Sequence, residues 1–353
     1  MTSGGRGATP GRPSLTVVLS PTRLIALAIC LAVPVALVAA DVSTSAAAPG
    51  IERVVTLGDS YSSGTGIHRN ASDYDDHGPA AQTFAPSTRI GNSACSRELD
   101  ETPGPRLAEQ LGAESVFVAC AGAVVADIAN QVDVASIPGD GAGTLVTMTI
   151  GGNDLRTVRG ENWPDTLVRC ITSAGCDGSS RNQIANLAEL RADLIDAYAA
   201  IGERYPRIAV RVLGYPRLMQ SDRWCEGVTG VSRGEANWVD EQVDRFNAQI
   251  RLATRVATAR TGADIAFVSV VEQFDNHGAC RFWQRDRYVN DAVFGETLKR
   301  SMTSDGDVRD HWDDGPLTIS GASFHPSSKG YDAYLEALSA SVRADLARAT
   351  PSR

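Results

Sequence analysis

Four short segments carry residue types that could together perform acyl transfer. "LGDSYSSG" (57–64) places Ser60 directly after a strand-like run, and "ACAGA" contributes the flexible backbone of Gly122. "IGGND" carries the side-chain amide of Asn153, and "SFHPSSKGY" carries the imidazole of His325. A serine nucleophile, an imidazole base and amide donors to an oxyanion are the groups that this chemistry needs. Gly, Asp and Ser after an apolar run also compose ordinary turns, so the serine alone does not decide the matter.

The elements that must position these residues can be read from the apolar pattern. Helical patterns lie at 184–201, 238–250 and 331–348, and the segments 65–94 and 271–324 are long, polar and irregular, which predicts loops. Strands that alternate with helices predict an α/β fold with a parallel sheet. The predicted strands are near-continuously apolar, as expected when helices cover both faces of a sheet. They span 53–57, 115–119, 144–150, 207–213 and 264–270.

The candidate residues follow the predicted strands. Ser60, Gly122 and Asn153 come directly after the first, second and third runs. Gly214-Tyr215-Pro216 follows the fourth run, and His325 lies in the long segment after the fifth. Ligands of a parallel sheet bind beyond the carboxyl ends of its strands. We therefore expect these groups to converge at one rim of the sheet, under the predicted loops.

Four ordered blocks resemble those of a known family. "GDSYSSG", "ACAGAVVADI", "IGGND" and "FHPSSKGY" are similar to the blocks of the SGNH (GDSL) hydrolases, most of all to secreted actinobacterial esterases and lipases. "LGYPRL" (213–218) and "FDNHGAC" (274–280) also resemble segments of those enzymes, and the likeness covers about residues 51–345. It implies a three-layer α/β/α flavodoxin-like sandwich with a central five-stranded parallel sheet, and a single hydrolase domain over 49–353.

The resemblance also implies a role for each candidate residue. Ser60 would be the nucleophile and His325 the general base. The amides of Ser60 and Gly122 and the side chain of Asn153 would form the oxyanion hole. In enzymes of this chemistry, loss of one such donor costs about 10²–10³ in rate.

The chain departs from the family pattern beside the histidine. The family usually has an Asp three residues before it, and this position is Ala322. Some actinobacterial relatives use a backbone carbonyl instead, and we expect the carbonyl of Ala322 or of a neighbour to orient His325. The alternative is that Asp313 or Asp314 folds back from the preceding loop to complete a triad.

The first 48 residues have the layout of a secretory signal peptide. An apolar run at 24–40 follows an Arg-containing start, and small-residue cleavage patterns end at Ala40 and Ala48. The alternative is an uncleaved anchor of 17 residues, at the short limit for a membrane span. We expect cleavage and export, with no stable membrane insertion of the mature chain. The basic residues before the run are Arg6, Arg12 and Arg23.

The negative charge of the chain limits the kinds of molecule that it can bind. The net charge is −9 at pH 7, and removal of 1–48, with three Arg and one Asp, makes it −11. Such a surface repels nucleic acid and anionic membranes. We expect a monomer that acts on a small-molecule ester or lipid and needs no cofactor.

Six cysteines remain after the predicted cleavage. An even number in an exported protein indicates three disulfides, and six cysteines allow fifteen connectivities. No C-x₂-C spacing occurs, which disfavours zinc. The resemblance, in addition, implies sequential pairing: Cys95–Cys120, Cys170–Cys176 and Cys225–Cys280.

Two other patterns have plainer explanations. "GVSRG" (230–234) matches the nucleophile elbow of a different hydrolase fold, but no strand precedes it. Ser232 is followed by Glu235 and a helical pattern, which predicts a capping box at a helix start. Acidic clusters at 73–77 and 305–314 could hold calcium, but neither has an EF-hand spacing, and solvated loops explain them. We therefore expect no metal site.

Three functions agree with these residues to different degrees. The leading interpretation is a secreted serine esterase or lipase that cleaves carboxylic esters through a Ser–His acyl-enzyme mechanism. A carbohydrate O-acetyl esterase would use the same chemistry and differ only in the loops. A secreted binding protein with a degraded site is favoured by Ala322 alone, and Ser60, Gly122, Asn153 and His325 oppose it.

Overall fold

The computed structural model describes most of the chain after residue 49. The described residues are 50–69, 95–173, 175–177, 183–220, 225, 230–283, 285, 287–294, 297–302, 308–313 and 319–349. All of them belong to one compact unit, Ala46–Arg353. The predicted signal peptide and the acidic cluster at 73–77 lie outside the described residues. Within these ranges, no helix has the length and apolar character needed to cross a membrane.

The centre of the fold is a five-stranded parallel sheet, as predicted. The strand order is β2-β1-β3-β4-β5, and every neighbouring pair is parallel. The chain starts at β1, turns to one side for β2 and returns past β1 for β3, so the connections diverge between β1 and β3. A crevice forms at such a switch point, beyond the carboxyl ends of the strands. The strands are β1 (Arg53–Gly58), β2 (Glu114–Phe117), β3 (Thr144–Thr149), β4 (Ala209–Leu213) and β5 (Asp264–Val268).

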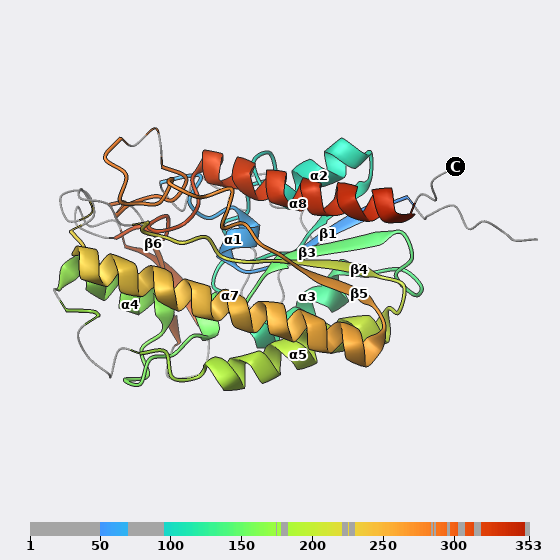
Figure 1. The fold of residues 1–353 in the computed structure, drawn as a ribbon, viewed down its shortest axis with the longest axis horizontal. Coiled ribbons are helices and arrows are strands. Elements are labelled where there is room, and N and C mark those ends of the chain that lie inside the picture. The colour runs from blue at the N-terminus through green and yellow to red at the C-terminus, as the bar shows by residue number, and fades with distance from the viewer. Residues whose placement is uncertain are drawn as a thin grey trace, which may run out of the picture. The chain divides into compact units, whose positions relative to one another are not determined.

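Helices cover both faces of this sheet, which confirms the predicted three-layer sandwich (Figure 1). One face is covered by α2 (Pro103–Leu111) and α8 (Ser328–Ala349). The other is covered by α3 (Ile128–Ala135), α5 (Leu187–Arg204) and α7 (Arg233–Thr261). All six residues of β3 are buried, because layers on both sides exclude water from a central strand.

The apolar stripes read from the sequence face the core. Each side chain of the stripes in α7 and α8 is buried, and burial of one large apolar side chain typically contributes about 1.5–3 kcal/mol. The start of α7 is a capping box: Ser232 Oγ accepts from the Glu235 amide, and a Glu235 carboxylate oxygen accepts from the Ser232 amide. The prediction for Ser232 is thus confirmed. The buried stripe residues are Trp238, Val239, Val243, Phe246, Ile250, Tyr331, Tyr334, Leu335, Leu338 and Val342.

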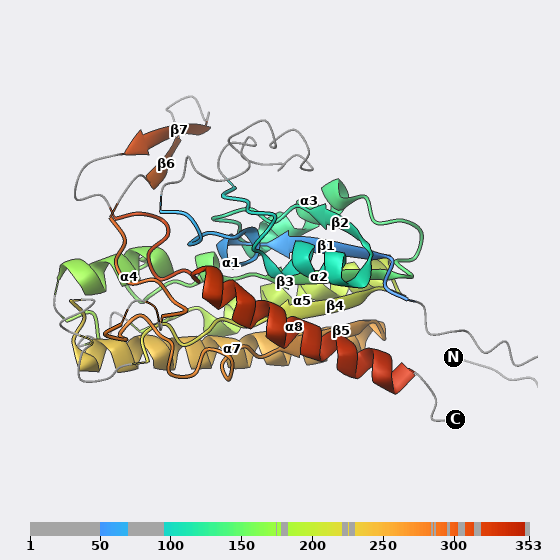
Figure 2. The same ribbon diagram turned by 90° about the horizontal axis from the view of Figure 1, so that it is seen from above.

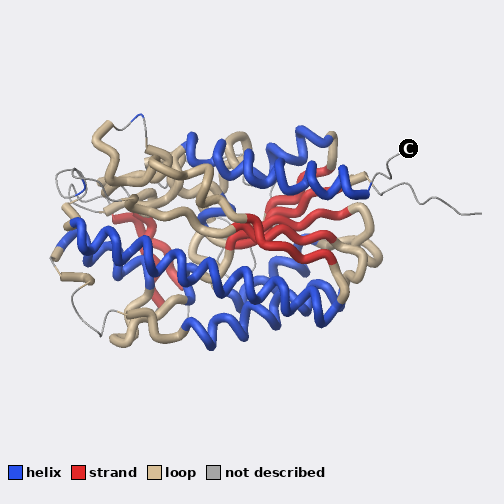
Figure 3. The backbone as a smooth tube through the Cα atoms, in the orientation of Figure 1, coloured by secondary structure: helices blue, strands red, loops and turns tan. Residues whose placement is uncertain are grey.

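The loops at the carboxyl ends of the strands are more structured than predicted. They contain α1 (Ser60–Ser63), the 3₁₀ turns η5 (Val125–Asp127) and η6 (Gly152–Asp154), and α4 (Trp163–Thr172) (Figure 3). The prediction that 271–324 is irregular is wrong in part. It includes a separate antiparallel hairpin, β6 (Thr297–Met302) and β7 (Val308–Asp313) (Figure 2).

Three disulfides link cysteines of the described residues: Cys95–Cys120, Cys170–Cys176 and Cys225–Cys280. They have the sequential pairing that the resemblance implied. The first joins the segment before α2 to the residues after β2, and the second closes the end of α4. Native disulfides of this kind typically stabilise a fold by about 2–4 kcal/mol each.

Candidate active site

Ser60 is presented by a sharp turn at the end of β1. Gly58 has a φ of 111°, and a Cβ there would lie 2.1 Å from the Thr149 carbonyl oxygen, so only glycine fits. The next residue, Asp59, is the N-cap of α1, and its carboxylate accepts from the Tyr61 amide at 3.1 Å. The turn and the cap together place Ser60 at the first position of a short helix, in the wall of a cavity.

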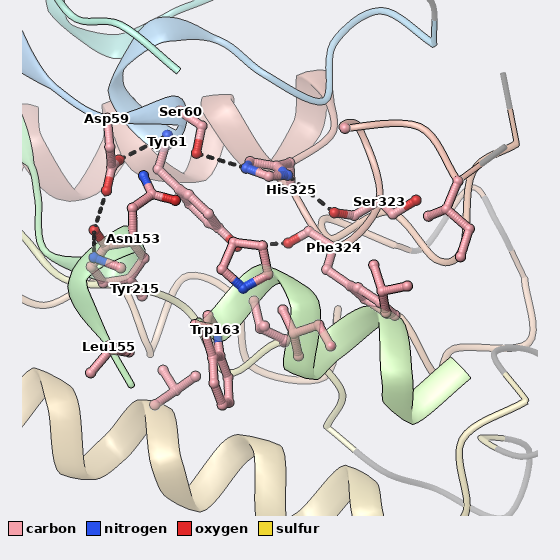
Figure 4. Close-up of a pocket in the computed structure, with 18 of the residues that line it drawn as sticks. Asp59, Ser60, Tyr61, Asn153, Leu155, Trp163, Tyr215, Ser323, Phe324 and His325 are labelled. Atoms are coloured by element: carbon pink, nitrogen blue, oxygen red, sulfur yellow. Dashed lines mark hydrogen bonds between the residues drawn. The ribbon is translucent and has the colours of Figure 1, made fainter. Parts of the chain in front are cut away.

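His325 lies 265 residues after Ser60 in the sequence, and the fold brings the two side chains into contact. Its Nε2 lies 2.7 Å from Ser60 Oγ, and its Nδ1 lies 3.1 Å from the carbonyl oxygen of Ser323 (Figure 4). A carbonyl can only accept, so Nδ1 carries the hydrogen and Nε2 is left to accept from the serine hydroxyl. The arrangement therefore selects the tautomer that a general base requires.

The carbonyl that faces the His325 ring belongs to Ser323, the neighbour of Ala322, so the prediction of Ala322 or a neighbour is corrected from Ala322 itself to Ser323. The Ala322 carbonyl instead accepts from the His325 backbone amide (3.3 Å) and from Asn290 Nδ2 (3.1 Å). The reason lies in Phe324, which has a left-handed φ of 58°. This sparsely populated conformation curls the chain so that the carbonyl two residues before the histidine faces its ring.

The acidic alternative falls outside what the structure describes. Asp313 ends β7, of which only the backbone is described, and Asp314 lies outside the described residues. The side chains of the acidic cluster at 305–314 lie outside the described residues. Elsewhere in the described part of the chain, no group of three His, Cys, Asp or Glu side chains is arranged to hold a metal ion.

The loop that carries His325 is tightly supported. The Tyr61 hydroxyl donates to the Phe324 carbonyl at 2.6 Å, and the Tyr61 ring lies 4.8 Å from the imidazole, centroid to centroid. The Asn290 amide donates to the His325 carbonyl at 2.9 Å. Gly66 approaches so closely that a Cβ would lie 2.7 Å from the His325 Cβ. Burial lowers the pKa of His325 to about 4, which keeps the ring neutral near pH 7.

Two of the three predicted oxyanion donors, Gly122 and Asn153, lie on adjoining loops. Asn153 belongs to η6 after β3 and lines the cavity, and its Nδ2 donates to the Ala123 carbonyl at 3.0 Å. Gly122 has a φ of 80°, and it is not among the described residues that line the cavity. The amides of Ala121 and Ala123, on either side of it, donate to the carbonyls of the Cys95–Cys120 pair.

Two residues to which the sequence assigned no role form a buried network behind Ser60. The Asp59 carboxylate accepts from Thr149 Oγ1 at 2.6 Å and from the Tyr215 hydroxyl, besides the Tyr61 amide. The same Tyr215 hydroxyl accepts from the Gly152 amide at 3.1 Å. Burial raises the pKa of Asp59 to about 6. The only sequence signal was position, because both residues directly follow predicted strands.

A cavity of about 240 Å³ opens beside Ser60 and His325. Helices α4 and α7 form much of its wall, and most of the exposed wall is apolar (Figure 4). Such a slot beside a serine and an imidazole can hold an apolar group while the attached polar group reaches the serine. Its apolar lining includes Leu155, Trp163, Leu167, Leu218, Val243 and Phe246.

Comparisons with known proteins agree with this arrangement, although no family model matches the chain. It is 30% identical over 267 residues to a lipase of Streptomyces rimosus, which covers 73% of this chain and 85% of that protein. It is 28% identical over 223 residues to lipase 1 of Streptomyces coelicolor, covering 62% and 73% of the two chains. The structure resembles a phospholipase A1 from Streptomyces albidoflavus NA297, with a TM-score of 0.53, 25% identity, and 82% and 98% of the two chains covered.

The parallel sheet, its strand order and these relatives define an ester hydrolase of the three-layer α/β/α class. More narrowly, the chain belongs to the SGNH (GDSL) family, among the actinobacterial lipases and esterases, and it is a carboxylic ester hydrolase.

Proposed function

We propose that the protein cleaves carboxylic esters through a covalent acyl-enzyme, with Ser60 as nucleophile and His325 as general base. The observation that carries this proposal is the 2.7 Å hydrogen bond between Ser60 Oγ and His325 Nε2 at the edge of the apolar cavity. The serine hydroxyl gives its proton to Nε2 as Oγ attacks the ester carbonyl. The imidazolium then protonates the departing alcohol, and a water molecule, activated in the same way, releases the acid.

Oxyanion stabilisation is assigned to the amides of Ser60 and Gly122 and to the side chain of Asn153. A side-chain amide carries two hydrogens. One hydrogen of Asn153 Nδ2 holds the Ala123 carbonyl, which fixes the orientation of the group, and the other is available to the tetrahedral intermediate. The same contact joins the Asn153 loop to the loop of Gly122, so the donors are organised before substrate binds.

The cavity favours an acyl chain over an acetyl group. Its apolar lining comes from α4, α7 and the loops that follow the strands, and the cavity is far larger than a methyl group. Burial of each methylene of a chain contributes about 0.8 kcal/mol. We therefore place the protein with esterases and lipases that act on lipid-like esters rather than with carbohydrate O-acetyl esterases.

We also propose that the protein is secreted as a monomer after cleavage following Ala40 or Ala48. The three disulfides support an oxidising destination, where such bonds form and persist. The negative net charge supports a small-molecule substrate over nucleic acid.

The test is hydrolysis of p-nitrophenyl esters from acetate to palmitate by the wild type and by Ser60→Ala. We expect the wild type to hydrolyse butyrate or longer esters faster than acetate, and the variant to have no activity at an almost unchanged thermal midpoint. Wild-type activity in Ser60→Ala would refute the nucleophile. A preference for acetate that falls with every added methylene would refute the acyl-chain assignment.

A further inference from the structure

We propose that Tyr215 is a positioning residue that couples the nucleophile turn to the oxyanion loop. This inference rests on the proposed function, because it assigns Tyr215 a role in the reaction of Ser60. The residue comes directly after β4, two strands away from the strand that carries Ser60.

The side chain of Tyr215 is held in place from several directions. Its backbone amide donates to Asn247 Oδ1 at 2.9 Å, and its carbonyl accepts from Asn247 Nδ2 at 2.8 Å. Its ring packs edge-on to Tyr61 and tilted against Phe246, with centroid separations of 5.0 and 5.3 Å. A buried ring fixed by its backbone and by two neighbours places its hydroxyl at a defined point.

That hydroxyl bridges the two parts of the site. It donates to Oδ2 of Asp59, the residue before Ser60, and it accepts from the amide of Gly152, the residue before Asn153 (Figure 4). One oxygen atom therefore sets the distance between the turn that carries the nucleophile and the turn that carries an oxyanion donor.

The Asp59 end of the bridge is enclosed, whereas Gly152 is half-buried in the wall of the cavity. Asp59 is 1% exposed, so its carboxylate depends on donors from the protein. Without the phenol, one of its donors is lost and the Gly152 amide loses its acceptor. The two turns would then relax independently, and an oxyanion donor misplaced by about 1 Å can cost about a hundredfold in rate.

The bridge also depends on the protonation of Asp59. The ionisable groups that face this carboxyl are Tyr61, Tyr198, Tyr215, Tyr334 and Asp154. A neutral carboxyl accepts a hydrogen bond more weakly than a carboxylate, so the bridge is strongest when Asp59 is ionised. Since the phenol stabilises the ionised carboxyl, its loss raises the pKa of Asp59 further and moves the acid limb of the pH–rate profile to higher pH.

The experiment compares Tyr215→Phe with a matched control, Tyr334→Phe. The Tyr334 hydroxyl is also buried and donates to the carbonyl of Gly214, the neighbour of Tyr215, so its hydrogen bond reaches neither Asp59 nor Gly152. Its ring packs edge-on to Tyr61, and Tyr334→Phe keeps that ring in place. Each variant removes one buried hydroxyl from the same region. We expect Tyr215→Phe to lower kcat for p-nitrophenyl butyrate by about ten- to a hundredfold, with KM within twofold of wild type. The acid limb of the pH–rate profile of Tyr215→Phe should shift to higher pH. Tyr334→Phe should keep kcat within about threefold of wild type, and its acid limb should not move.

Equal kcat values and equal acid limbs in the two variants would overturn the proposal, because a purely structural hydroxyl affects both alike. If Tyr215→Phe folds poorly, Asp59→Asn breaks the same bridge from its other end and should lower kcat with KM retained. Tyr215→Phe and Asp59→Asn should act through the same bridge. If the fold-losses in kcat of the two single variants multiply in the double variant Tyr215→Phe/Asp59→Asn, the coupling is also overturned. Failure of Ser60→Ala to abolish activity would overturn the proposed function instead, so the two failures are distinguishable.

Discussion

At the scale of single residues, the described partner of His325 Nδ1 is a dipole, the Ser323 carbonyl, where a triad would have a charge. The Ser323 carbonyl can orient the His325 ring through Nδ1, but it gives the imidazolium less stabilisation than a carboxylate gives. Burial also explains why the pKa of His325 lies at about 4. The ring is therefore in its basic form throughout the neutral range.

We expect the distal acids to contribute little to this pair. Asp313→Asn and Asp314→Asn should each lower kcat for p-nitrophenyl butyrate by less than about tenfold, whereas the amide variant of a true triad acid loses about 10⁴. The measurement is kcat at a pH where His325 is neutral, with circular dichroism as the control for folding. A thousandfold loss in either variant would show that a distal Asp completes a triad.

The ionisation of Asp59 should determine how kcat/KM falls at acid pH. It should also lower the free energy of unfolding above pH 6, where the buried carboxyl is charged. Its pKa is raised to about 6, so kcat/KM should fall as the pH drops through about 6, although His325 is still neutral there. In Asp59→Asn, the maximum of kcat/KM should be lower than in the wild type. The fall of kcat/KM on the acid side should move towards about pH 4, where His325 becomes protonated.

The same variant should be more stable than wild type at pH 8. A raised pKa in the folded state means that ionisation above pH 6 costs stability, and asparagine is an equally good N-cap without the charge. We expect a gain of roughly 1–3 kcal/mol at pH 8 that shrinks as the pH falls below 6. Denaturant unfolding at pH 5 and pH 8 measures it, and a loss of stability at pH 8 would contradict it.

At the scale of elements, α4 contributes Trp163, Pro164, Leu167 and Val168 to the wall of the cavity. The Asn162 side chain caps this helix by accepting from the Asp165 amide at 2.8 Å, and Cys170–Cys176 closes its other end. Trp163 packs against Trp238 of α7 with ring centroids 6.0 Å apart. A helix held at both ends presents a stiff wall to the cavity.

A larger side chain on this wall should shorten the accepted acyl chain. Leu167→Trp, at a buried position in the lining, should reduce hydrolysis of octanoate and longer p-nitrophenyl esters at least tenfold more than that of acetate. Leu252→Trp makes the same change at an exposed position of α7 and should leave the chain-length profile unchanged. Equal profiles in the two variants would place the acyl chain elsewhere.

At the scale of the whole molecule, the cysteines should be fully oxidised. Alkylation of the purified mature protein without reductant should leave its mass unchanged, since its six cysteines form three disulfides. After reduction, the mass should increase by six alkyl groups. Alkylation of two or more cysteines before reduction would contradict the pairing.

The sequence predicted those features of the fold that are encoded locally. Continuous apolar runs predicted all five strands, and long stripes predicted the three longest helices. Short elements with Pro and Gly, such as α2, were missed because local composition favours turns there. The hairpin was missed because charged residues at Arg300 and Asp310, which are paired in register, interrupt its apolar alternation.

The site was less predictable than the fold, for physical reasons. The identity of the carbonyl beside His325 depends on the left-handed φ of Phe324. No local sequence pattern predicts that conformation. The role of Tyr215 depends on a contact with Asp59, 156 residues away in the sequence. Both features exist only once the strands are assembled.

The hydrogen bond between Ser60 and His325 spans 265 residues, so the site joins the first turn of the fold to one of its last loops. During synthesis, the proposed nucleophile leaves the ribosome long before its proposed base. His325 and α8, the helix that follows it and covers one face of the sheet, emerge after all five strands of the sheet. Under the proposed mechanism, a nascent chain therefore has no hydrolytic activity until His325 has been added, and any fragment truncated before residue 325 should be inert.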